Sequence, residues 1–588
     1  MTLTQFGWAP ELGGLQNFFR HPAKWQLAAR EKRDANMDKI PEEWILDPTI
    51  LADGKSRRCV VGEFIELLLD DKSRHITSLD VLDLVTGMKH GKLTAVEVVT
   101  AFCKRAAYAH QLSGLLLEIR FHEAIEEARR LDEIYKKDKR LVGPLHGVPL
   151  TLKDQFHIKG LDTSMGFVGW IGTFGGKVIK NPENVVESEL VRELRILGAI
   201  PIGKTTLTQS LWAPETNNNI LGYTFNPCNR NFSAGGSSGG EGAMQALRGS
   251  AFGIATDIGG SVSMPASFQG VFSLKPSAGR ISFKDATNTG QGQEVMPTVV
   301  GIMAHSVESL RLVFKSLLSV EPWLYDPYAL PIPWRSEKEY NPQEEPEYKP
   351  AFGLIAHDGM LTPHPPITRA LDIVKKALET NGHQLIDWEW KRHVETVDIH
   401  GLIARGDGCY DVYDAARLSG EPFVPEIKNL FPNNRPKAPL PLPEYEKVVQ
   451  RMKEYRQEYL EYWMSTAKRT GDRPVEAVIS PVTPYAGVLP GGFSRSTYTS
   501  SINVLDYAAV VIPVTVADKE IDVVSPDFEP LGENDDLNMK LYDSEKQHGA
   551  PAAIQLIGRR LDEERLLSLA QTVVNAINAY KSEHDKGC

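Results

Sequence analysis

Cysteine is scarce and widely scattered in this chain of 588 residues. The five cysteines, Cys59, Cys103, Cys228, Cys409 and Cys588, are odd in number and include no C-x-x-C pair. This pattern excludes a disulfide-rich secreted scaffold and disfavours a structural zinc site, and it is typical of free thiols in a reducing compartment. We therefore expect a cytoplasmic protein without a metal centre.

Long apolar runs and an excess of positive charge are also missing. The longest apolar run, 507–517, is too short to span a bilayer and contains Pro513, and the first residues lack the pattern of a secretory signal. The formal net charge of -11 does not indicate a basic surface that could bind nucleic acid or an anionic membrane. We expect no nucleic-acid partner and no membrane insertion.

The length and texture of the chain indicate one large α/β domain. A hydrophobic content of 42% can supply a large core. From residue 143 onward, short apolar segments such as 148–152 and 199–202 alternate with helical patterns. This alternation predicts a mixed, mostly parallel twisted sheet that is covered by helices on both faces.

The two ends of the chain have a different texture from its middle. Residues 1–75 are polar and charge-dense, whereas the helical pattern begins near Ser78. We divide the chain into an N-terminal arm packed on the core (1–75), a catalytic domain (76–580) and a C-terminal tail (581–588).

Glycine is concentrated around two serine clusters. Residues 235–240 read GGSSGG, and Gly259-Gly260-Ser261 follow soon after. Because glycine weakens regular structure, such density predicts positive φ or a close backbone approach at a bound ligand. Taken alone, two tight turns with local serine hydrogen bonds would be the simpler explanation.

A reactive serine needs a base and donors that stabilise an oxyanion. The sequence GGSSG matches the G-x-S-x-G pattern, with Ser237 as nucleophile and His305 or His548 as candidate bases. That motif requires a buried strand directly before it, whereas residues 226–231 read NPCNRN. A Ser-His-Asp α/β-hydrolase is therefore the weaker alternative.

Three segments taken together resemble the amidase signature family. They are LKD at 152–154, GGSSGG at 235–240 and GIATDIGGS at 253–261. The segments GPLHGVPLTLKD, SMGF, ETNNNILG, HSVESLRL and IGRRLDEER also stand in the family's order, and they resemble its fungal acetamidase and general amidase branch. The resemblance runs from about Trp25 to Ile577 and implies a single amidase-signature domain that hydrolyses amides without a cofactor.

Matched residue by residue, the resemblance implies a Ser-cisSer-Lys triad. Ser261 takes the position of the nucleophile, Ser237 that of the bridging serine and Lys153 that of the base. A lysine can act as a base only if desolvation lowers its pKa, and the apolar residues 148–152 are compatible with such burial. Taken alone, Lys153 and Asp154 would more simply form a surface ion pair, because lysine is seldom buried.

The same resemblance implies which backbone groups contact the substrate. The N–H groups of Ile258, Gly259, Gly260 and Ser261 would form the oxyanion hole, and glycine would keep the approach clear of side chains. The family position whose carbonyl receives the scissile amide N–H falls on Leu211.

One departure from the family pattern concerns the loop after the nucleophile. Many members have Arg two residues after that serine, whereas this chain has Ser263. If the Arg supports the loop by hydrogen bonding, its absence puts that support in question, but not the triad.

We expect an amidase that converts small aliphatic or aromatic linear carboxamides to carboxylate and ammonia through a serine acyl-enzyme. The alternatives are hydrolysis of longer N-acyl amides, a non-catalytic scaffold of the same fold, and a subunit of a tRNA-dependent amidotransferase, which the acidic charge disfavours. The expected partner is a small-molecule amide, and the sequence is compatible with a homodimer.

Overall fold

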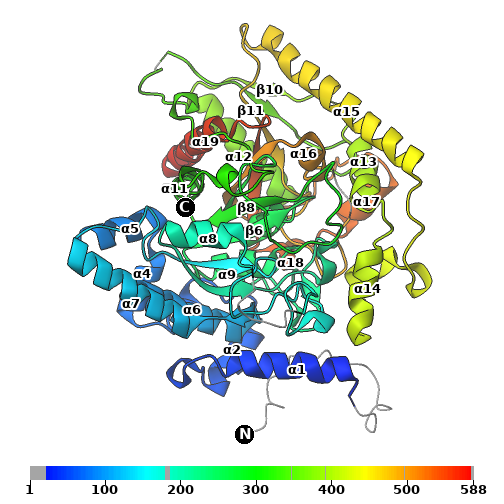
Figure 1. Cartoon of the computed structure of the whole chain (residues 1–588). Helices are drawn as coiled ribbons and strands as arrows, with labels where there is room; N and C mark the ends of the chain where they lie inside the picture. The colour runs from blue at the N-terminus through cyan, green and yellow to red at the C-terminus, as the bar shows by residue number, and fades with distance from the viewer. Residues whose placement is uncertain (1–21, 179–185, 346, 391, 495–496, 585–588) are drawn as a thin grey trace.

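One large sheet organises the molecule (Figure 1). The computed structural model describes residues 22–178, 186–345, 347–390, 392–494 and 497–584. Over these residues the sheet has eleven strands. In spatial order they are β1 (Leu116–Ile119), β3 (Ile200–Thr205), β2 (Pro149–Lys153), β6 (Phe252–Asp257), β8 (Val299–Ala304), β7 (Phe272–Lys275), β12 (Ala508–Val516), β13 (Pro551–Gly558), β11 (Ala477–Pro481), β9 (Phe352–Leu354) and β10 (Leu385–Asp387). A separate small hairpin pairs β4 (Asn217–Asn218) with β5 (Gly222–Tyr223).

Parallel pairing is found in two groups of strands, β3-β2-β6 and β11-β9-β10. Between these groups, and at β1, the pairs are antiparallel. The parallel pairs β2/β3 and β9/β10 are separated in sequence by α8 (Glu189–Ile196) and α12 (Pro365–Thr380). No helix separates β7 from β8, which pair antiparallel. The predicted mixed α/β class is confirmed.

Helices cover both faces of the sheet, as the sequence predicts. Along β12, Val510 and Ile512 face one core cluster, whereas Ala509 and Val511 face clusters on the other side, as the period of a strand requires. The first face packs against α11 (Val307–Ser319), α12 and α19 (Glu563–His584). The second packs against α10 (Ser263–Gln269), α13 (Glu395–Ala404), α15 (Leu442–Ser465) and α16 (Ser500–Leu505).

The described part of the N-terminal arm lies against α6 (Ala95–Ser113) and β1. Its helices are α1 (Lys24–Met37), α2 (Pro48–Ser56), α3 (Glu63–Glu66) and α4 (Asp71–Ser78), and α1 runs along the lower edge of the molecule (Figure 1). Trp44, Leu51 and Ile65 join the main core cluster. The helices α5 (Val81–Lys89) and α7 (Phe121–Asp138) complete this end.

The C-terminal helix continues further than the sequence suggests. Helix α19 extends to His584, because Lys581 still reaches back to the carbonyl of Val514 in the sheet. The predicted tail thus begins with helix, and residues 585–588 lie outside the described part. Among the described helices, none combines the length and apolarity that a membrane crossing requires.

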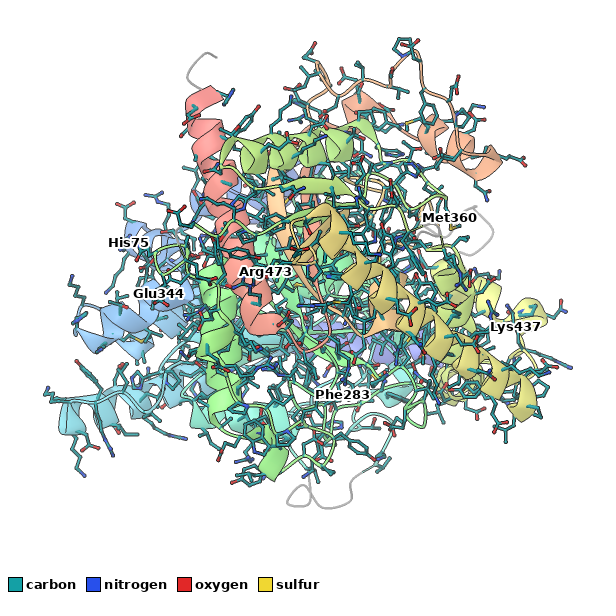
Figure 2. The ribbon with its side chains drawn as sticks, turned by 90° about the horizontal axis from the view of Figure 1, so that it is seen from above. His75, Phe283, Glu344, Met360, Lys437 and Arg473 are labelled. Carbon is teal, nitrogen blue, oxygen red and sulfur yellow. The ribbon has the colours of Figure 1, made fainter. Side chains whose placement is uncertain are left out.

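Four further α-helices complete the described part of the chain. They are α9 (Gly239–Ala246), α14 (Tyr410–Ser419), α17 (Glu533–Lys540) and α18 (Ser544–Gln547). Among them, α9 contributes Ala243 and Met244 to the main core cluster. Seen from above, His75 on α4 and Lys437, which precedes α15, lie on opposite sides of the molecule (Figure 2).

Candidate active site

Lys153, the last residue of β2, is fully buried. Its Nζ donates hydrogen bonds to Ser237 Oγ at 2.7 Å and to Thr256 Oγ1 at 3.0 Å. Burial lowers the pKa of Lys153 to about 7, although the carboxylates of Asp257 and Glu241 oppose this shift. Because its hydrogen-bond partners are neutral hydroxyls, a neutral amine is accessible near neutral pH.

Asp154 is not the ion-pair partner of Lys153. Its carboxylate lies 2.6 Å from the ammonium of Lys204 on β3 and accepts hydrogen bonds from the N–H groups of Ser164 and Met165. Neither Lys153 nor Asp154 is on the surface. The surface ion pair that these two residues would suggest on their own is therefore absent.

The first glycine-serine cluster packs tightly against residues 206–216. A Cβ on Gly236 would lie 2.6 Å from the backbone nitrogen of Glu215, and one on Gly240 would lie 2.4 Å from the carbonyl oxygen of Thr206. The Gly236–Ser237 peptide bond is cis, as the resemblance implied. Glycine is thus required here because two backbones approach each other closely. This close approach places Ser237 at the end of β2.

Asp257, at the end of β6, organises the loop that carries Ser261. Its carboxylate accepts hydrogen bonds from the N–H groups of Gly260 and Val262, both at 2.7 Å, and from Asn503 Nδ2 at 3.0 Å. The N–H of Ser263 lies 3.5 Å away. Asn503 lies on α16, so a neutral side chain from a distant helix supports the Asp257 carboxylate.

The carbonyl groups of the same loop are held from outside. His400 on α13 lies with its Nε2 2.8 Å from the carbonyl oxygen of Ile258, and the Thr499 hydroxyl donates to the carbonyl of Gly259 at 2.9 Å. In the described residues, the N–H groups of Ile258, Gly259 and Ser261 have no protein acceptor.

The expected role of Gly260 as an oxyanion donor needs correction, because its N–H is already bonded to Asp257. The reason for the glycines also differs from the expected one. A Cβ on Gly259 would lie 2.8 Å from His400 Nε2, and one on Gly260, whose φ is +112°, would lie 2.5 Å from Thr499 Oγ1. Glycine is therefore needed at both positions because side chains of the protein itself, and not a ligand, pack against the backbone there.

Four of the predicted site residues line one cavity, namely Leu211, Ser237, Ile258 and Ser261. Trp212, Thr256, Asn288, Thr289 and Thr298 complete its wall. Lys153 lies behind Ser237 and outside this lining. Leu211 follows Ser210 in an unusual backbone, with φ of 76° and 72°, and such strain is characteristic of functional sites.

Sequence reasoning missed several residues of this site. The Thr256-Asp257 pair, directly before the second glycine cluster at a strand end, was a usable signal. His400, Thr499 and Asn503 come from distant helices and gave no local signal.

A family model described as Amidase matches residues 97–567. The acetamidase of Aspergillus oryzae is 41% identical over 94% of this chain and 98% of its own, and that of Emericella nidulans has the same identity and coverage. A solved structure of fatty acid amide hydrolase has a TM-score of 0.84 at 26% identity and covers 94% of this chain and 95% of its own.

The fold, the site and these matches define the class, and the chain belongs to the amidase family. It is an amide-hydrolysing enzyme that is similar to fungal acetamidases. The predicted resemblance is confirmed.

Proposed function

We propose that this enzyme hydrolyses linear carboxamides through an acyl-enzyme on Ser261, with Ser237 as the bridging serine and Lys153 as the base. The observation that carries the proposal is the 2.7 Å hydrogen bond between Lys153 Nζ and Ser237 Oγ, behind a cavity that Ser237 and Ser261 share.

In the proposed first step, neutral Lys153 accepts the proton of Ser237, whose oxygen accepts the proton of Ser261. The Ser261 oxygen attacks the amide carbonyl carbon and forms a tetrahedral intermediate. Ser237 then relays a proton to the departing nitrogen, and the C–N bond breaks. Water repeats the path, releasing the carboxylic acid and restoring the Ser261 hydroxyl.

The oxyanion would be stabilised by the N–H groups of Ile258, Gly259 and Ser261, which have no protein acceptor in the described residues. Leu211 also lines the cavity, and its carbonyl would accept the amide N–H of the substrate. The Gly260 N–H would keep its bond to Asp257 and hold the loop in shape.

Small aliphatic or aromatic amides are the proposed substrates, and the names of the fungal relatives support this choice. The likeness to fatty acid amide hydrolase favours longer N-acyl amides as a second candidate. A panel from acetamide to aryl and long-chain amides, ranked by kcat/KM, separates the two. A steady rise in kcat/KM with chain length would overturn the preference for small amides.

The nucleophile is tested by Ser261→Ala, with Ser263→Ala as the matched control. Both serines are buried, Ser261 in the loop and Ser263 at the start of α10, but only Ser261 lines the cavity. We expect Ser261→Ala to abolish ammonia release and Ser263→Ala to retain most of it. Equal activity in the two variants would contradict the assignment.

The geometry gives less support to a Ser-His-Asp mechanism. Ser237 Oγ is hydrogen-bonded to Lys153, whereas His305 is half-buried after β8 and His548 lies near Asp518. Neither histidine lines the cavity of the serines.

A further inference from the structure

Two cysteines face each other where the N-terminal arm meets the loop that leads to Ser237. Residues 58–60 and 227–230 are joined by two backbone hydrogen bonds, from the Val60 N–H at 2.9 Å and from the Arg230 N–H at 2.7 Å. One bond lies on either side of Cys59 and of the Cys228–Asn229 pair. Residues 226–229 form a turn in which the Asn229 N–H donates to the carbonyl of Asn226 at 3.2 Å, so the two bonds bracket Cys59 on one segment and Cys228 with Asn229 on this turn.

This spacing suits a disulfide bond. Two residues bracketed by such bonds lie close together, and disulfides join Cα atoms roughly 4.4 to 6.8 Å apart. Both cysteines are free thiols in this structure. Burial, together with the neighbouring Cys59, raises the pKa of the Cys228 thiol.

The pairing of the two segments is held by a third one. The guanidinium of Arg58 donates hydrogen bonds to the carbonyl groups of Lys546 and His548, and Asn229 Nδ2 donates to the same two carbonyl groups. Because both segments use the same anchor, the two cysteines keep their register without a large backbone movement.

The two thiols differ in access. Cys59 is exposed, whereas Cys228 is half-buried and its Sγ donates to the carbonyl of Gln269 at 3.6 Å. An oxidant in solution therefore meets Cys59 first, and Cys228 is placed behind it as a resolving thiol.

We propose that Cys59 and Cys228 form an oxidisable dithiol, a covalent modification site outside the active site. The Cys59 thiolate attacks one sulfur of a low-molecular-weight disulfide such as oxidised glutathione, forms a mixed disulfide and releases one thiol. The Cys228 thiol gives its proton to solvent, and its thiolate attacks the Cys59 sulfur and releases the second thiol. Two protein thiols are oxidised and one disulfide is reduced.

The disulfide bond between Cys59 and Cys228 would link the N-terminal arm covalently to the core. Cys228 contacts Gln269, the last residue of α10, which begins just after Ser261. The closed loop would be long, and a crosslink across a long loop restricts the unfolded chain most. We therefore expect the oxidised protein to unfold at a higher temperature than the reduced protein.

The test incubates the full-length protein with oxidised glutathione and then digests it without reduction. We expect mass spectrometry to find the peptides of Cys59 and Cys228 joined, with two of the five thiols lost to titration under denaturing conditions. Reduction should restore all five thiols and reverse the rise in unfolding temperature.

The exposed position of Cys59 makes Cys59→Ser a safe variant for folding, and Cys588→Ser is the matched control. Cys59→Ser should lose both the joined peptides and the rise in unfolding temperature, whereas Cys588→Ser should keep both. The proposal is overturned if the wild-type protein keeps five thiols, carries glutathione on Cys59 alone, or joins other cysteines.

Discussion

Lys153 and Lys204 are two lysines on neighbouring strands that are equally buried and chemically different. Both are fully inaccessible, and β2 and β3 place Leu152 beside Lys204 in the parallel register. Lys204 pairs with the carboxylate of Asp154 at 2.6 Å and also donates to the hydroxyl of Thr163. Within the part of the chain that the structure describes, the hydrogen-bond partners of Lys153 are the hydroxyls of Ser237 and Thr256.

The comparison teaches that burial alone does not make a lysine a base. Desolvation disfavours the ammonium of any buried lysine, but an adjacent carboxylate restores it. Asp257 and Glu241 act on Lys153 without a hydrogen bond to it, and its pKa still falls to about 7. What separates the two lysines is therefore the partner within hydrogen-bond distance.

The largest expected effect comes from exchanging each lysine for methionine. Lys153→Met removes the proposed base, and we expect kcat/KM to fall by about a hundredfold to ten-thousandfold or more. Lys204→Met leaves the Asp154 carboxylate buried and unpaired, which costs about 3 to 5 kcal/mol of stability. Activity per folded molecule and urea unfolding measure the two effects.

The same two variants also test whether the comparison of Lys153 with Lys204 is correct. Lys153→Met should keep a stability near that of the wild type, because Lys153 forms no close ion pair with a buried carboxylate. A Lys153→Met enzyme with normal turnover would contradict the base assignment, and an unaltered unfolding midpoint in Lys204→Met would contradict the structural role of that lysine.

The next effect is the pH dependence of the wild-type enzyme. Below a pKa of about 7, Lys153 is protonated and cannot accept a proton. The value of kcat/KM for the free enzyme should therefore rise about tenfold per pH unit below that pKa and level off above it. Rates measured with a neutral amide, between about pH 5 and about pH 9, test this, and a fall from pH 6 to pH 8 would disprove it.

A smaller change in the pH profile should distinguish the effect of the Asp257 charge from the effect of its hydrogen bonds. The Asp257 carboxylate raises the pKa of Lys153, so Asp257→Asn should move the rising limb to lower pH and should also lower kcat by loosening the Ser261 loop. Asn503→Ala removes one donor from that carboxylate but keeps its charge. It should lower kcat and leave the limb in place.

The pH profiles of both variants are the measurement. A limb that shifts equally in Asp257→Asn and Asn503→Ala would mean that loop geometry, and not the charge, sets the pKa of Lys153.

Much of the site was predictable because its key residues sit in dense local motifs. Lys153 directly follows the apolar residues 148–152, and the serines lie within glycine clusters. The resemblance implied a role for each of them. The apolar strand before Lys153 was compatible with its burial, although Lys153 and Asp154 taken alone favoured a surface ion pair. The partner of Asp154 was not predictable, because Lys204 is brought beside it only when β2 and β3 pair.

The glycines show the same limit. Their density correctly predicted close approach, but what approaches Gly259 is His400, from a helix far along the chain. The oxyanion loop was expected to offer four N–H groups, and Asp257 takes that of Gly260. Nothing in the local sequence shows which acceptor an N–H will meet.

The sequence by itself determined the mixed α/β class, the amidase family and the positions of Lys153, Ser237 and Ser261, because these follow from local patterns along the chain. Only the tertiary structure decided which carboxylate pairs with which lysine, which N–H groups are free, and how His400, Thr499 and Asn503 hold the loop. Hydrogen bonds and desolvation depend on distances in space, and those distances exist only after distant segments have packed together.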